Sequence, residues 1–398
     1  MVCHKMNALA VSHRAERQAG RHPAPREGTH AAVNRRGRPM PGGPRTVRPR
    51  AAVRALAARA IAGTLAVALL GPAVSAAESA DAAPRKAVEH CRELIRPCQL
   101  SDGLIRMRAD GEIVRGVPYF ANIAAVALLA PRHRQPESSD VGRVRRWLAW
   151  YAAHQKPDGT VHKYSGTVGC YARTEKLDTT DTSASLYLLA LNRYRKASRD
   201  RHLRARFGVS AIRAIEAVRS LVDPTDGLTW ARPGNRNKYL MDNVLVSLCM
   251  ADAAELLEAM GDRQRATEAR QIRRGISESV ARFLPPGAGH FAWAIGAGGR
   301  LSTGLDLPYP HQRANLYALA HLEAVPQGLW PRLRDACPTD RLVMTTRSYF
   351  AARRVGSAED RTRFRSIVLE QARSLRPDNC DVFEPALAIL VLTDDVAL

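Results

Sequence analysis

The sequence is poor in cysteine and aromatic residues, and it lacks paired metal-ligand motifs. Its 398 residues include seven cysteines, and aromatic residues make up 6%. No two cysteines form a C-x-x-C motif, and no two histidines stand at zinc-ligand spacing, so the common zinc sites are excluded. We therefore expect no metal and no other cofactor.

Basic runs interleaved with aromatic residues are also absent, although the net charge is +22. Residues 1–76 hold 13 Lys and Arg against 2 acidic residues, and residues 77–398 hold 47 against 36. Each part therefore contributes +11, and the second share is spread over the chain. Nucleic-acid binding calls for a concentrated basic surface. We expect no nucleic-acid partner.

Long apolar runs are limited to one, Ile61–Leu70, which follows Arg54 and Arg59. Gly71-Pro72 ends the run, and small residues up to Ala76 form a cleavage site. This order is typical of a secretory signal peptide over residues 51–76, and the run is short for a bilayer span. An uncleaved anchor is the alternative.

Two further expectations follow for the N-terminal part. Residues 1–50 are rich in Arg, Pro and Gly and are expected to be disordered or untranslated. Residues 77–398 would then be the exported protein, a single extracellular domain without stable membrane insertion. We expect it to be a monomer.

Export changes the interpretation of the cysteines, because an oxidising compartment permits disulfides. The six cysteines after the signal allow fifteen pairings. Cys91 is close in sequence to Cys98, and a Cys337–Cys380 bond would join the C-terminal helices. Cys249 lies on an apolar helix face and is expected to be a buried thiol.

Helical periodicity dominates residues 77–398, and strands are few. The predicted helices cover residues 84–97, 118–130, 141–155, 178–198, 201–221, 238–260, a segment ending near 284, 309–323, 326–336, 340–354, 358–375 and 384–393. Short extended pieces are expected within 99–116 and 161–164, and a Gly-rich loop or hairpin within 287–304. Similar helices joined by alternately short and long loops predict an all-α fold, an (α/α)6 toroid with short β pieces at the cleft. An α-solenoid is the alternative, but no fixed repeat is found.

Three loop-to-helix junctions carry acids or amides: Tyr119–Asn122, Asp178–Asp181 and Tyr239–Asn243. Such side chains cap helix starts, but a cap needs only one of them, whereas the second junction offers two carboxylates on one face. In a toroid these helix starts can converge on one cleft.

Hydrolysis of a glycosidic bond requires one protonated and one ionised carboxyl group. We select Asp181 and Asp242 as the catalytic pair, with Asp178 as the third candidate. Asp158 and Asp226 precede glycine, so turn formation already explains them. Aromatic rings can stack on sugar rings, although core packing is the alternative for each. The residues expected to bind a carbohydrate substrate are Tyr119, Asn122, Asp102, Trp230, Tyr239, Asn243, Trp293 and His311.

Residues 95–394 resemble the six-hairpin glycosidase-like superfamily. The run D-x-x-D-T-S-A-S-L-Y-L-L-A-L from Asp178 is similar to the helix of family 8 glycoside hydrolases in which an acid acts in catalysis. The Y-L-M-D-N-V helix resembles that of glucoamylase- and trehalase-like enzymes, and Asp242 stands where they often have Glu. P-Y-F-A-N-I-A-A-V-A-L-L resembles a first inner helix. There, Asn122 replaces the Glu that family 8 enzymes carry nearby.

The resemblance implies a secreted glycoside hydrolase acting on a poly- or oligosaccharide. A polysaccharide lyase is the first alternative, with Tyr239 or His311 as base and Arg232 or Arg236 neutralising a uronate. The second is a carbohydrate-binding scaffold that has lost one catalytic acid, as Asn122 suggests.

Overall fold

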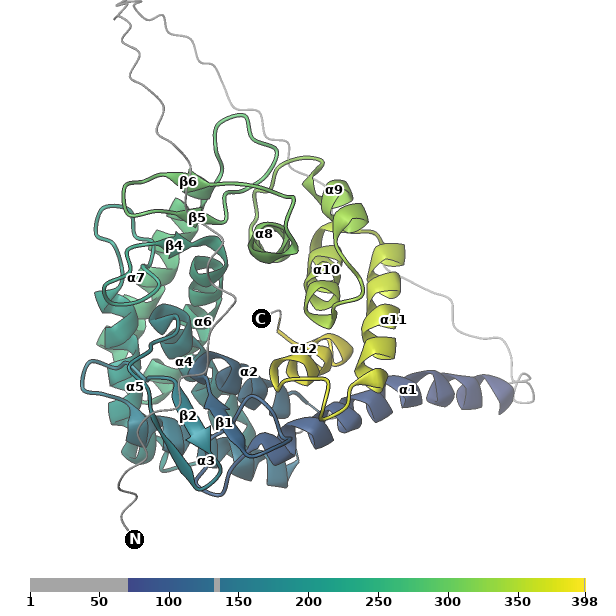
Figure 1. Ribbon diagram of the computed structural model, residues 1–398, viewed down its shortest axis with the longest axis horizontal. Helices are drawn as coiled ribbons and strands as arrows, with labels where there is room; N and C mark the ends of the chain where they lie inside the picture. Colours follow the sequence, from purple (N-terminus) through teal and green to yellow (C-terminus); the bar gives the residue numbers. More distant parts are fainter. Residues whose placement is uncertain (1–70, 132–136, 397) are drawn as a thin grey trace, which may run out of the picture. The chain divides into compact units, whose positions relative to one another are not determined.

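Six helices form a closed inner ring in the computed structural model, which describes residues 71–131, 137–396 and 398. Each packs against the next, and the last packs against the first (Figure 1). In ring order they are α2 (Pro118–Leu128), α4 (Thr180–Ser198), α6 (Leu240–Ala259), α8 (Arg313–His321), α10 (Leu342–Val355) and α12 (Phe383–Leu392).

Sequence explains why these helices lie inside. In α12, nine of ten residues are buried, as expected of a helix that is apolar on every side. The intervening helices are amphipathic. In α7, for example, Ala266, Ala269, Ile272 and Ile276 make one buried stripe. The outer helices are α1 (Gly71–Ile95), α3 (Ser138–His154), α5 (Leu203–Ser220), α7 (Arg263–Ser279), α9 (Leu329–Ala336) and α11 (Ala358–Ser374).

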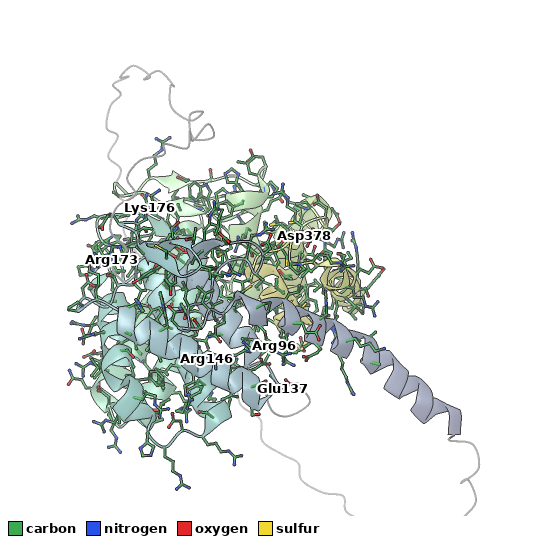
Figure 2. The ribbon with its side chains drawn as sticks, turned by 60° about the horizontal axis from the view of Figure 1, so that its bottom comes forward. Arg96, Glu137, Arg146, Arg173, Lys176 and Asp378 are labelled. Atoms are coloured by element: carbon green, nitrogen blue, oxygen red, sulfur yellow. The ribbon has the colours of Figure 1, made fainter. Side chains whose placement is uncertain are left out.

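The N-terminal outer helix is tied to the ring by buried charge. Arg96, in the short helix η1 (Arg96–Cys98) after α1, donates two hydrogen bonds to the fully buried Asp140 of α3, at 2.9 and 3.0 Å. Its guanidinium also pairs with Glu137 at 3.0 Å (Figure 2). On the other side, His90 contacts the Leu375 carbonyl oxygen just after α11. Helix α1 therefore joins α3 to the end of α11.

Two small antiparallel sheets lie in the loops that lead into the inner helices. The first has the order β1-β2-β3 and the second β4-β5-β6. Their strands are β1 (Ile113–Gly116), β2 (Tyr164–Thr167), β3 (Cys170–Arg173), β4 (Lys238–Tyr239), β5 (Ala294–Ile295) and β6 (Leu301–Ser302). Two further short helical turns are η2 (Val280–Phe283) and η3 (Pro308–Gln312).

The predicted (α/α)6 toroid is confirmed, and the described residues form twelve α-helices. Most lie close to their expected positions, but α1 begins at Gly71, well before the predicted start at residue 84. The Gly-rich stretch is the β5–β6 hairpin, as expected. The extended piece predicted at 161–164 overlaps β2 only at Tyr164. Strand β2 runs on to Thr167, because it pairs with β1 and β3 over the residues from Tyr164 to Thr167. The Asp158 turn forms as predicted, since its carboxylate accepts the Thr160 N–H, and Gly159 adopts φ 82°.

The predicted extension at 1–50 and most of the signal peptide, 51–70, lie outside the described residues, whereas Ala76 lies in α1. Described residues from Pro72 onward form one compact unit. Cys91, Cys98, Cys249, Cys337 and Cys380 are buried thiols, so neither suggested pair is bonded. No described helix has the length and apolar character of a membrane span.

Candidate active site

A cavity of about 460 Å³ lies where α4, α6 and α8 begin. Three segments form its wall: the residues before α4, the loop and first turn of α6, and the loop before α8. The lining residues are Asp178, Thr179, Ala231, Arg232, Asn235, Tyr239, Met241, Asp242, Trp293, Tyr309 and Pro310. Two carboxylates and three aromatic rings therefore face one space.

Two asparagines hold the loops of this wall in the same way. The buried Asn243 side chain accepts the Thr229 N–H at 2.7 Å and donates to the carbonyl oxygens of Thr229 and Tyr239. Asn315 of α8 likewise accepts the Phe291 N–H and donates to the carbonyl oxygens of Phe291 and His311. Each amide thus satisfies buried backbone groups of a loop, which fixes that loop on its helix. Asn243 is a positioning residue rather than a substrate contact.

The second sheet brings the aromatic residues of the wall together. Tyr239 of β4 pairs with Ala294 of β5, so its ring lies beside Trp293, with centroids 6.1 Å apart and planes 8° apart. His311 continues the row, 6.3 Å from Trp293, and its Nδ1 is 2.7 Å from the Asp306 carboxylate. Nearly parallel rings along a wall are a suitable surface for the apolar faces of sugars.

Asp242, in the first turn of α6, carries the least satisfied carboxyl group of the wall. Among the described residues, no hydrogen-bond partner reaches its buried Oδ2 atom. Burial raises the pKa of Asp242 to about 7, the negative charge of Asp178 adds to the rise, and Arg313 opposes it. Near neutral pH this carboxyl is therefore partly protonated, as a proton donor requires.

Asp178 also lines this cavity, and its carboxylate has different neighbours. Its Oδ1 is 2.9 Å from the Lys163 ammonium, and the two side chains are 25% and 34% exposed. This is an open ion pair at the mouth of the cavity, with its carboxylate still accessible.

Asp181 is fully buried and is not among the residues that line the described cavity. One carboxylate oxygen accepts the Thr229 hydroxyl and the other the Thr182 N–H, both at 2.8 Å. Burial, together with the charge of Asp242, raises the pKa of Asp181 well above its usual value. Asp181 thus holds Thr229 behind the wall, whereas Asp178, in the loop before α4, lines the cavity.

The other predicted substrate contacts fall into separate places. Asn122 is fully buried, donating to the Ser183 carbonyl oxygen and accepting the Trp147 indole N–H. Asp102 is exposed, accepts the Leu104 N–H and is hydrogen-bonded to the Tyr171 hydroxyl.

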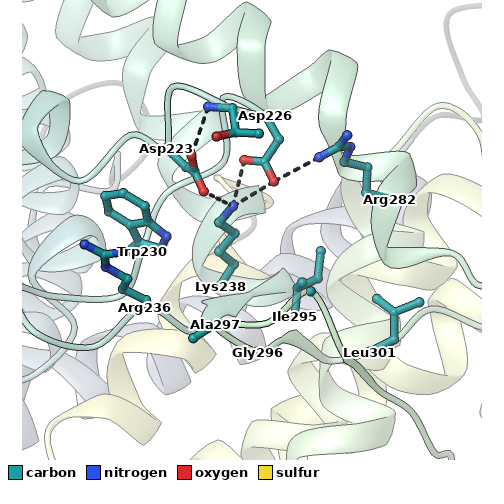
Figure 3. A pocket seen from close by; sticks show the side chains of 12 residues that line it. Asp223, Asp226, Trp230, Arg236, Lys238, Arg282, Ile295, Gly296, Ala297 and Leu301 are labelled. Atoms are coloured by element: carbon teal, nitrogen blue, oxygen red, sulfur yellow. Dashed lines mark hydrogen bonds and ion pairs between the residues drawn. The ribbon is translucent and has the colours of Figure 1, made fainter.

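Trp230 lines a second cavity of about 500 Å³, shown in Figure 3. There Lys238 bonds to Asp223 at 2.5 Å and to Asp226 at 2.7 Å, and Arg282 also pairs with Asp226. Arg236 lies over the Trp230 ring at 5.3 Å. Because these acids and cations pair with each other, this cavity lacks an unpaired carboxyl like that of Asp242.

Sequence reasoning missed two arginines beside the candidate site, Arg313 of α8 and Arg347 of α10. The Arg347 guanidinium lies 4.3 Å from the Tyr317 ring, and that of Arg313 lies 5.7 Å from the Tyr309 ring. Tyr119, a predicted contact, packs against Phe383, which both arginines also face. A charged residue on a helix normally indicates the solvent face, so the sequence offered no signal for this cluster.

Solved structures of sugar-degrading enzymes share this fold. A rhamnosidase from Klebsiella oxytoca with rhamnose bound matches with a TM-score of 0.54 at 13% identity, covering 77% of this chain and 63% of its own. An α-1,6-mannanase from a Salegentibacter species matches with a TM-score of 0.51 at 12% identity, covering 78% and 98%. A family 8 endoglucanase from Klebsiella pneumoniae matches with a TM-score of 0.50 at 14% identity, covering 76% and 97%.

These identities are low, so the likeness concerns the fold alone. The chain spans less than two thirds of the rhamnosidase. The sequence matches no protein-family profile, and no curated protein matches it.

Proposed function

We propose that the protein is an exported glycoside hydrolase that cleaves a poly- or oligosaccharide in the cavity lined by Asp178 and Asp242. The observation that carries the proposal is the buried, unpartnered Oδ2 atom of Asp242, whose carboxyl has a raised pKa and lines a cavity shared with a second carboxylate. The parallel rings of Tyr239 and Trp293 supply a stacking surface. Fold similarity to glycosidases supports this reading as an analogy.

In the proposed reaction, Asp242 donates its proton to the glycosidic oxygen while the bond from that oxygen to the anomeric carbon breaks. Asp178 takes a proton from water, and the water oxygen forms the new bond to the anomeric carbon. Asp242 is left ionised and Asp178 protonated, and proton exchange with solvent restores both. Asp181 acts by holding Thr229 and hence the loop behind the wall.

Reducing-end release from neutral and acidic polysaccharides tests this assignment. Asp242→Asn and Asp178→Asn should each lower the rate by about 10²-fold or more, because each removes a proton-transfer group. The control Asp335→Asn changes a surface carboxylate paired with Arg334 and should leave the rate unchanged. Full activity in both site variants would refute the carboxylate pair. Products that absorb ultraviolet light in addition to carrying new reducing ends would identify a lyase, for which Tyr239 and Arg232 also line the cavity. Reducing ends without that absorbance would identify a hydrolase.

Export rests on the signal-peptide pattern around Ile61–Leu70. The N-terminal sequence of protein collected from the culture medium tests it. A start near Ala77 supports cleavage, and retention of the whole protein inside the cell argues against export.

A further inference from the structure

Two arginines from neighbouring inner helices meet around one aromatic ring. The guanidinium carbons of Arg313 and Arg347 lie 5.5 and 6.0 Å from the Phe383 centroid. Arg347 also stacks on Tyr317 at 4.3 Å and is only 3% exposed. The pair therefore places two positive charges inside the ring of helices, at the end where α8 and α12 begin.

No acid among the described residues forms a salt bridge with either arginine, although the charge of Arg313 acts on Asp242 from a greater distance. No carboxylate oxygen lies within salt-bridge distance of either guanidinium, and the buried Nε atoms of both arginines and Nη2 of Arg347 have no acceptor. Burying a charge without a partner is unfavourable, because the charge loses its hydration. Burial lowers the pKa of Arg347 to about 10, which expresses the same cost. An arrangement of this kind is expected where an anionic ligand supplies the missing partner.

The pair adjoins the candidate active site. Arg313 faces the Tyr309 ring, which lines the cavity, and its charge acts on Asp242. Arg313 also retains some exposure, whereas Arg347 is almost fully buried. Neither arginine lines the cavity itself, but a group bound to Arg313 would lie beside Tyr309 and so next to a molecule held there.

We propose that Arg313 and Arg347 bind the carboxylate of an acidic sugar, so that the substrate is a glycan containing uronic acid. The conclusion that the ligand is a sugar rests on the proposed glycosidase function. The donors without an acceptor are the buried Nε atoms of both arginines and Nη2 of Arg347, whereas Arg313 also hydrogen-bonds to Tyr317. A planar guanidinium can donate two parallel N–H groups from one edge to the two oxygens of a planar carboxylate.

The rim beside the cavity is also basic. A neighbouring cavity of about 540 Å³ shares Arg232 and Asn235 with the first and is lined by Lys163, Lys176 and one acid, Glu175. Figure 2 shows Arg173 and Lys176 along the same edge of the molecule. An acidic polymer extending from the arginine pair would meet attractive charge there.

Binding of free monosaccharides to the full chain tests the proposal. Glucuronate and galacturonate are titrated by calorimetry and by their effect on the melting temperature, with glucose and sodium sulfate as matched probes. We expect the uronates to bind and to raise the melting temperature, while glucose and sulfate at equal concentration do neither.

Three variants separate recognition from packing. Arg313→Met and Arg347→Met should weaken uronate binding by about tenfold or more, since a hydrogen bond to a charged group is lost. Arg347→Met should also raise the melting temperature of the unliganded protein, because it removes an unpaired buried charge. A purely structural arginine would give the opposite shift. Arg347→Lys keeps the positive charge but loses the planar set of N–H donors, so it should bind uronate more weakly than wild type. It should also have a lower melting temperature than Arg347→Met, because the buried charge remains.

The outcomes distinguish this inference from the proposed function. Uronate binding that requires both arginines supports the inference, even if no polysaccharide is cleaved and the hydrolase assignment fails. Equal binding of glucose, binding of sulfate alone, or uronate binding unchanged in both Met variants would overturn it. Cleavage of neutral polymers that depends on Asp242, with no uronate binding, would overturn it while leaving the hydrolase assignment intact.

Discussion

At the scale of single residues, environment rather than residue type separates the three aspartates at the candidate site. Asp181 has both oxygens hydrogen-bonded in the interior, Asp178 has an exposed lysine partner, and Asp242 has a buried oxygen with no partner in the described structure. The sequence predicted that acids gather here, but it ranked Asp181 above Asp178. The prediction that they share a helical face was wrong, because Asp181 lies in the first turn of α4 and Asp178 in the loop before it. The two carboxyl groups therefore lie at different depths.

The raised pKa of Asp242 predicts a pH-dependent effect on stability. Its pKa of about 7 in the folded protein exceeds the ordinary value of 3.8, so the folded state binds the proton more tightly. Its contribution is therefore fully present below about pH 4 and is lost as pH rises through 7. Asp242→Asn should raise the melting temperature by a few degrees at pH 8 and change it little at pH 4. Thermal unfolding at both pH values measures this, and a variant equally destabilised at both would contradict it.

At the scale of elements, the helices were largely predictable and the placement of loops was not. Apolar periodicity and Gly261 locate α6 within a few residues, since these signals are local. Asn243 and Asn315 each form a clamp, meaning the side-chain hydrogen bonds that hold a loop on its helix. The two clamps join residues 14 and 24 positions apart, so only the folded chain reveals them. The short strands were hard to place for the same reason, because each exists only through its partner.

The Asn243 clamp gives a prediction at this scale. Asn243→Ala leaves the buried Thr229 N–H and carbonyl groups without partners, which should lower the free energy of unfolding by about 2–4 kcal/mol. It should also raise the KM for polysaccharide, since Tyr239 loses its anchor. As a control, Asn379→Ala breaks a contact in an exposed turn and should cost about 1 kcal/mol or less. Equal losses in urea unfolding of the two variants would contradict the clamp.

At the scale of the whole molecule, the candidate site is a product of ring closure. Asp178 precedes α4, Asp242 starts α6, Arg313 starts α8, and Arg347 comes from α10, so four inner helices contribute. The sequence could predict that helix starts converge, because hairpins place them at one end. It could not show that two of its many arginines point inward, since this depends on how α8, α10 and α12 meet around Phe383.

The pKa of Asp242 is accordingly a property of the assembled ring. The pH dependence of activity is the most direct test of the proposal that Asp242 is the proton donor. With Asp242 as proton donor, kcat/KM on the best polysaccharide should fall as pH rises through about 7, approaching tenfold per unit above pH 8. Arg313→Met removes a charge that lowers this pKa, so its residual activity should fall off at higher pH. A wild-type kcat/KM that stays constant from pH 6 to pH 9 would contradict the assignment of Asp242 as the acid.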